Sequence, residues 1–174
     1  FVARFGARRC ISFEPNPILI DRIKENIELN EFTNKISIGP YALSDKTGVV
    51  SLRIPKNGLG SSAIGKKICS NNIIDVQQTT LKKALQEFKE VYPDIIKIDV
   101  EGHEFQVLEG SKRTALNGKT KFLVEIHSSK LLPIEENLDR VINWAKSISY
   151  KVLYLAKMKF INDSESIKNR GRCH

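Results

Sequence analysis

The segment "IIKIDVEGHEF" changes from apolar to charged within a few residues. Asp99, Glu101 and Glu104 follow a run of isoleucines, and Gly102 allows a tight backbone turn between them. Acids where a buried strand reaches the surface cost stability unless they find partners. Their position therefore indicates a functional edge, where Asp99 and Glu101 would serve as a general base or face a cationic partner. Glu104 needs no such role, because the dipole of a first helical turn favours an acid.

Polar residues also end two other predicted strands. Glu14 follows "CISF", and Glu125 and His127 fall in "LVEIH". In open α/β sheets, ligands bind beyond the carboxyl ends of the strands. Glu14 could accept both hydroxyls of a ribose there, or it could simply begin the next helix. His127 is equally compatible with a hydrogen-bonded structural role and with proton transfer.

A metal site at this edge is conceivable but not predicted. Asp99, Glu101, Glu125 and His127 offer oxygen and nitrogen ligands. Their spacing matches no recognised ligand signature, so we expect no metal.

Apolar patterns predict strands that alternate with helices, and hence an α/β fold with an open, mostly parallel sheet and helices on both faces. The runs at 94–99 and 121–127 predict fully buried strands. Between 55 and 70, glycine and serine predict a surface loop and candidate lid. The other predicted strands are 10–14, 36–38, 49–54, 73–78 and 151–156, and the predicted helices are 17–31, 81–88, 103–116 and 135–148.

Particular residues support the predicted helices. Asn16 is a good N-cap and Pro17 suits the first helical position, while Thr80 is a candidate cap for the second helix. In the third helix, the pattern places Phe105, Leu108 and Leu116 on the inward face. In the fourth helix, the inward positions are Leu138, Ile142, Trp144 and Ala145.

Composition limits the function classes. The chain has 174 residues, about one domain, with a net charge of +8. Its basic residues are scattered and not interleaved with aromatic residues, so we expect no nucleic-acid partner. No apolar run reaches the roughly 18 residues of a membrane span. Three widely separated cysteines fit a reducing, cytoplasmic setting.

The motifs, taken in order, resemble the FkbM-like S-adenosylmethionine-dependent methyltransferases. The matching segments are "FEPNP", "ENIELN", "YALSDKTG", "GSS", "IKIDVEGHEFQVLEG" and "FLVEIH", between about Gly6 and His127. The resemblance implies a Rossmann-like class I methyltransferase sheet with one antiparallel edge hairpin. It also implies S-adenosylmethionine as cofactor and methylation of a hydroxyl on a sugar or small metabolite.

The resemblance also implies roles for individual residues. Glu14 corresponds to the ribose-binding acid with Asn16 beside it, and Ala42 and Leu43 would flank the adenine. Asp99 and Glu101 would face the sulfonium and the acceptor pocket, with His127 on the acceptor side. The general base is then Asp99, Glu101 or His127, in no fixed order.

One feature of the resembled family is absent. Its glycine-rich cofactor loop, Asp-x-Gly-Ala-Asn-x-Gly, should precede "FGARRCISFEPNP", and "RCH" resembles the start of its last strand. We therefore expect residues 1–174 to form one partial methyltransferase domain, which lacks its first central strand and its last strand and is inactive alone.

Other functions remain open. A Rossmann-like module that binds a nucleoside without turnover would share the fold, and the charge of +8 keeps an RNA methyltransferase in view. An NAD-dependent oxidoreductase would also use a ribose-binding acid, but "YALSD" and "DVEGHE" argue against it. The residues indicate neither a particular acceptor nor an oligomeric state.

Overall fold

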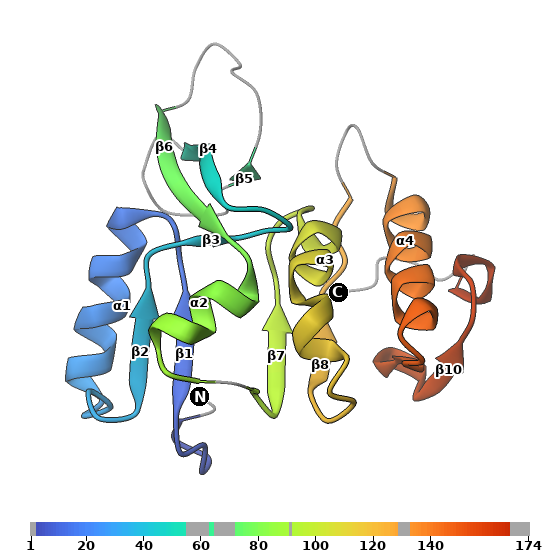
Figure 1. The fold of residues 1–174 in the computed structure, drawn as a ribbon, viewed down its shortest axis with the longest axis horizontal. Helices are drawn as coiled ribbons and strands as arrows, with labels where there is room; N and C mark the ends of the chain where they lie inside the picture. Colours follow the sequence, from blue (N-terminus) through green and yellow to red (C-terminus); the bar gives the residue numbers. More distant parts are fainter. Residues whose placement is uncertain (1–2, 55–62, 65–71, 91, 129–132, 168–174) are drawn as a thin grey trace.

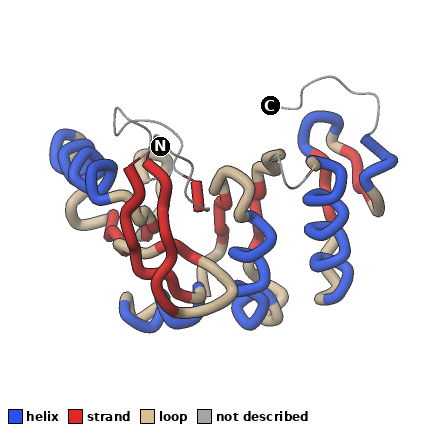
Figure 2. Tube along the Cα trace, turned by 90° about the horizontal axis from the view of Figure 1, so that it is seen from above, coloured by secondary structure: helices blue, strands red, loops and turns tan. Residues whose placement is uncertain are grey.

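The computed structural model describes residues 3–54, 63–64, 72–90, 92–128 and 133–167. Within them, four helices and ten strands give a mixed α/β fold. Figures 1 and 2 show that α1 (Pro17–Leu29) and α4 (Ile134–Ser147) lie at opposite ends of the molecule.

Two parallel strand pairs form the centre of the fold. β1 (Cys10–Phe13) pairs with β2 (Ile36–Gly39), and β7 (Ile95–Ile98) pairs with β8 (Lys121–Val124). The arrowheads of β2 and β7 point the same way in Figure 1, so the carboxyl ends of all four strands face one edge. No ladder joins β1 to β7 within the described residues.

The prediction that residues 94–99 and 121–127 form fully buried strands is wrong. Ile98 is buried, but Ile95 is 64% exposed and Leu123 is 42% exposed. Burial alternates along β7 and β8 because the hydrophobic core, built with α3 and α4, covers one face, and no described element buries the other. The predicted strand 121–127 also ends early, at Val124.

A second sheet has the order β3-β6-β4-β5. β4 (Gly48–Ile54) and β6 (Asn72–Thr79) are antiparallel, while the two-residue β3 (Ala42–Leu43) runs parallel to β6. The sequence patterns missed β3, and they missed β5 (Ala63–Ile64) inside the predicted 55–70 loop. The rest of that candidate lid lies outside the described residues.

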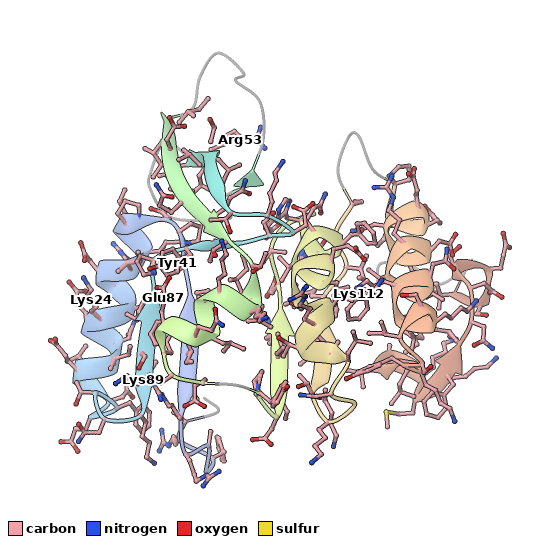
Figure 3. The ribbon with its side chains drawn as sticks, viewed as in Figure 1. Lys24, Tyr41, Arg53, Glu87, Lys89 and Lys112 are labelled. Carbon is pink, nitrogen blue, oxygen red and sulfur yellow. The ribbon has the colours of Figure 1, made fainter. Side chains whose placement is uncertain are left out.

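The helices begin largely where their caps predict. The Asn16 side chain accepts a hydrogen bond from the Ile18 amide at 3.0 Å and caps α1, as predicted. Thr80 occupies the cap position of α2 (Leu81–Glu87), but its side chain makes no capping bond. Tyr41 and Glu87 lie near each other in Figure 3. The tyrosine hydroxyl donates to the Glu87 carboxylate at 2.5 Å and joins the residue before β3 to the end of α2.

The main core lies between β7–β8 and helices α3 (Glu104–Ala115) and α4. Leu108, Leu138, Ile142, Trp144 and Ala145 are buried as predicted. Leu116 is 63% exposed, because it follows the last turn of α3, so its predicted inward position is wrong.

The described chain ends in an antiparallel pair, β9 (Val152–Tyr154) and β10 (Lys159–Ile161). The short 3-10 turns η1 (Leu155–Lys157) and η2 (Ser164–Ile167) follow β9 and β10 respectively. No helix of the described residues is long and apolar enough to span a bilayer.

Candidate active site

The turn between β7 and α3 brings the acids of "DVEGHE" to the strand edge. Glu101 and Gly102 have φ angles of +52° and +96°, so the chain reverses through the left-handed region. A non-glycine residue in that region costs about 1 kcal/mol or more, which must be offset elsewhere. The backbone amide of Gly102 donates to Glu104 Oε1 at 2.9 Å, which stabilises the turn.

The three predicted catalytic residues lie together. One ligand atom from each of Asp99, Glu101 and His127 falls within 4.8 Å of the others. His127 Nε2 lies 3.8 Å from Asp99 Oδ1 and 3.9 Å from Glu125 Oε1, beyond hydrogen-bond distance of both. The ring nitrogen thus faces a group of carboxylates that do not hold it.

Lys97 lies beside this cluster. Its Nζ is 2.5 Å from Asp99 Oδ2 and 4.0 Å from Glu125 Oε2, and 55% of the side chain is exposed. Exposure screens such a pair, so Lys97 offsets part of the negative charge without removing it.

Glu104 forms a buried network behind the cluster. Its side chain is 0% exposed, and His127 Nδ1 lies 2.8 Å from Oε1. Asn137 Nδ2 donates to Glu104 Oε2 at 2.9 Å and to the His127 carbonyl at 3.0 Å. The network therefore joins α3, α4 and the residues after β8.

Sequence reasoning missed the importance of Glu104 and Asn137. Glu104 shares the buried face of α3 with Leu108, Ser111 and Ala115. Acids are almost never fully buried unless they are paired, so an acid at this helical spacing was a usable signal.

The surroundings of His127 favour its charged form. Burial lowers the pKa of His127, but the hydrogen bond to Glu104 and the charges of Glu101, Glu104 and Asp99 outweigh burial and raise it. A histidine tuned upward in this way remains able to hold a proton near neutral pH.

Two carboxylates and one imidazole are also donors that suit a divalent cation. The expectation of no metal, which rested on sequence spacing, stays a prediction.

Glu14 and Asn16 form a separate polar group at the end of β1. The backbone N–H of Asn16 donates to Glu14 Oε1 at 2.8 Å, and Asn16 itself is buried. Burial raises the pKa of Glu14, and the bond from Asn16 partly lowers it again. Glu14 Oε2 has no hydrogen-bond partner among the described residues. A half-buried acid with one oxygen held and the other available fits a ligand hydroxyl.

Ala42 and Leu43 lie in β3 and pack against two apolar clusters. Ala42 is buried with Leu52, Ile54 and Val76, and Leu43 packs on the core that contains Ile98. Leu43 is half-buried, so part of this residue remains exposed, whereas Ala42 is buried.

The Glu14 group and the Asp99 cluster follow strands that end at one edge (Figure 1), although β1 and β7 belong to separate ladders.

Comparison with known proteins identifies the family of the chain. The family described as "Methyltransferase FkbM domain" matches residues 1–152. The chain therefore belongs to the FkbM methyltransferase family. A crystal structure of methyltransferase FkbM from Methylobacillus flagellatus KT superposes with a TM-score of 0.55 at 17% identity, over 83% of this chain and 32% of that one. At that identity the match shows the fold alone, and it is consistent with a Rossmann-like sheet.

Two curated relatives carry methyltransferase names. Hexuronic acid methyltransferase AglP from Haloferax volcanii is 30% identical over 137 residues, which cover 72% of this chain and 54% of that protein. Methyltransferase sdnD from Sordaria araneosa is 24% identical over 139 residues, which cover 62% of this chain and 52% of that protein. The chain thus spans about half the length of the curated relatives it matches.

Proposed function

We propose that this chain belongs to an S-adenosylmethionine-dependent methyltransferase that methylates a hydroxyl on a sugar or small metabolite. The observation that carries the proposal is the cluster of Asp99, Glu101 and His127 at the carboxyl edge of β7 and β8. Family membership supports methyl transfer, and the hexuronic acid methyltransferase supports a sugar acceptor.

Glu14 is the residue proposed to bind the ribose of the cofactor. Its Oε1 is held by the Asn16 amide, which leaves Oε2 for a ribose hydroxyl. Ala42 and Leu43 are proposed to flank the adenine through the backbone of β3. The bound cofactor supplies an electrophilic methyl group on a sulfonium.

His127 is the best placed of the three candidate bases. An alcohol is a poor nucleophile at neutral pH and gains from a base within hydrogen-bond distance. His127 Nε2 would take the proton of the acceptor hydroxyl and so make its oxygen a better nucleophile toward the methyl group. Asp99 and Glu101 would stabilise the imidazolium and orient the acceptor hydroxyl.

We further expect the domain to be completed by a strand between β1 and β7. In the described residues each of these strands is paired on one side only. A reducing, cytoplasmic setting is part of the same proposal.

The test is turnover in the full-length protein with a hexuronic acid, a neutral sugar and an RNA oligonucleotide as acceptors. We expect methylation of a sugar, and a fall in kcat of about 10²-fold in His127→Ala. Lys24→Ala, on the exposed face of α1 (Figure 3), is the control and should match the wild type. Wild-type rates in Asp99→Ala, Glu101→Ala and His127→Ala alike would remove the proposed base.

Calorimetry with S-adenosylmethionine separates the rival functions. Glu14→Ala should weaken cofactor binding about 10-fold. Binding without turnover on any acceptor would point to a non-catalytic nucleoside-binding module. Turnover on RNA alone, with steep salt dependence, would point to an RNA methyltransferase.

A further inference from the structure

Glu104 has no part in the function proposed above, yet it makes the shortest polar contact of the histidine. It is a carboxylate with 0% of its side chain exposed, on the first turn of α3. A favourable helix dipole explains an acid at this position but not its complete burial.

Three nitrogen atoms lie within hydrogen-bond distance of the two oxygens of Glu104. The backbone N–H of Gly102 and the Nδ2 group of Asn137 can only donate, at 2.9 Å each. Glu104 therefore accepts hydrogen bonds on both oxygens. An ionised carboxylate can only accept, so the third contact, between His127 Nδ1 and Oε1 at 2.8 Å, then places the proton on Nδ1.

Among the described residues, no hydrogen bond reaches the other ring nitrogen, Nε2. Nε2 is 3.8 Å from Asp99 Oδ1 and 3.9 Å from Glu125 Oε1, too far for a hydrogen bond to either. In the neutral ring, a proton on Nδ1 makes Nε2 an acceptor. Asn137 Nδ2, which donates to Glu104, also donates to the His127 carbonyl at 3.0 Å and so ties the His127 backbone to the same network.

We infer that Glu104 is a positioning residue, which fixes the tautomer and orientation of His127 so that Nε2 faces the Asp99–Glu101 edge as a proton acceptor. This inference rests on the proposed function where it concerns catalysis, but the tautomer itself does not depend on it.

The first test is the tautomer of His127 in the wild-type chain. Long-range nitrogen–proton correlation NMR distinguishes a proton on Nδ1 from one on Nε2 without any turnover. At a pH where the ring is neutral, we expect the proton to lie on Nδ1. A dominant Nε2–H form would overturn the inference, because Glu104 would then be a donor to Nδ1.

The second test replaces the carboxylate by its amide. Glu104→Gln keeps the shape but cannot accept from all three donors, so we expect a mixture of tautomers at His127. Glu109→Gln, on the same helix and without a hydrogen bond to the cluster, is the matched control and should keep the wild-type tautomer. If the Glu104→Gln protein folds normally and the His127 tautomer is unchanged, the inference is overturned.

The third test is kinetic and uses the full-length protein. Glu104→Gln should lower kcat about 10²-fold with little change in KM for the cofactor, and should shift the acid limb of the pH profile. The charged groups that face His127 are Asp99 and Glu101 in the turn, Glu104 on α3 and Glu125 after β8, with Lys97 on β7 beside the acids. Glu104→Asp should recover part of the loss, which a merely structural defect would not do.

The two failures are distinguishable. If the NMR results hold and His127→Ala keeps full turnover, Glu104 still sets the tautomer and the proposed base is wrong. If kcat in Glu104→Gln equals the wild type while His127→Ala is impaired, the positioning role in catalysis is wrong and the proposed base stands.

Discussion

Two histidines lie near the start of α3, and one contacts a neutral hydroxyl while the other contacts a carboxylate. His103 precedes the helix, and its Nε2 lies 3.1 Å from the hydroxyl of the buried Ser44. His127 follows β8, and its Nδ1 lies 2.8 Å from the buried carboxylate of Glu104. One ring therefore joins two elements through a neutral contact, while the other lies among acids.

The pKa values of the two rings move in opposite directions. Burial lowers the pKa of His103 more than Asp45 and Glu104 raise it, and Lys46 lowers it further. The pKa of His127 is raised, because the Glu104 bond and the neighbouring acids outweigh its burial. The balance between burial and ionised neighbours thus sets the opposite directions of the two pKa values.

The largest expected effect on stability comes from disturbing the packing of α3 against Ser44, the partner of His103. A Cβ on Gly110 would lie 1.9 Å from the Ser44 carbonyl oxygen, which is backbone and cannot move aside. Gly110→Ala should therefore push α3 away from β3 and cost about 3 kcal/mol or more of the free energy of unfolding. Urea denaturation measures the loss, with Gln106→Ala on the same helix as a control expected within about 0.5 kcal/mol. Wild-type stability in Gly110→Ala would mean that α3 and Ser44 do not pack this closely.

The next largest effect comes from disturbing the network of Asn137, Glu104 and His127. Asn137→Ala removes the donor to both Glu104 Oε2 and the His127 carbonyl, and leaves one buried and one partly buried acceptor short of a partner. We expect a loss of about 2 kcal/mol in the free energy of unfolding, and NMR signals of His127 that change while those of His103 do not. Asn143→Ala, on the exposed side of α4, should change neither. Equal disturbance of both rings would show that the two sides are not independent.

The pH dependence of stability sharpens the comparison. Because the folded pKa of His127 lies above its ordinary 6.5, its contribution is fully present below pH 6.5 and is lost as pH rises through the folded value. For His103, whose folded pKa lies below 6.5, neutral folding is favoured above that pH and stability is lost as pH falls below it. The stability gap between wild type and His127→Gln should therefore widen toward acid, and that for His103→Gln should narrow. Parallel pH curves for the two variants would contradict the opposite shifts.

The sequence predicted the edge better than the support behind it. Strand ends placed Asp99, Glu101 and His127 together, because parallel strands point the same way. The roles of Glu104 and Ser44 depend on which helix face is buried and on how closely α3 approaches β3, which are tertiary facts. The buried-strand prediction for residues 94–99 failed for a related reason, since an apolar run does not tell which faces other elements cover.

The smallest expected effect is that of Lys97→Met. The pair with Asp99 is exposed, so its loss should change the free energy of unfolding by less than about 0.5 kcal/mol. Without the lysine, the charges of Asp99 and Glu125 are no longer offset, and the pKa of His127 should rise further. His103, whose charged neighbours are Asp45, Lys46 and Glu104, should titrate as before. NMR titration of both rings in one sample measures this, with Lys24→Met as the control. A fall in the pKa of His127 would mean that Lys97 holds the acids in place near the ring, so that geometry rather than net charge sets the difference between the two histidines.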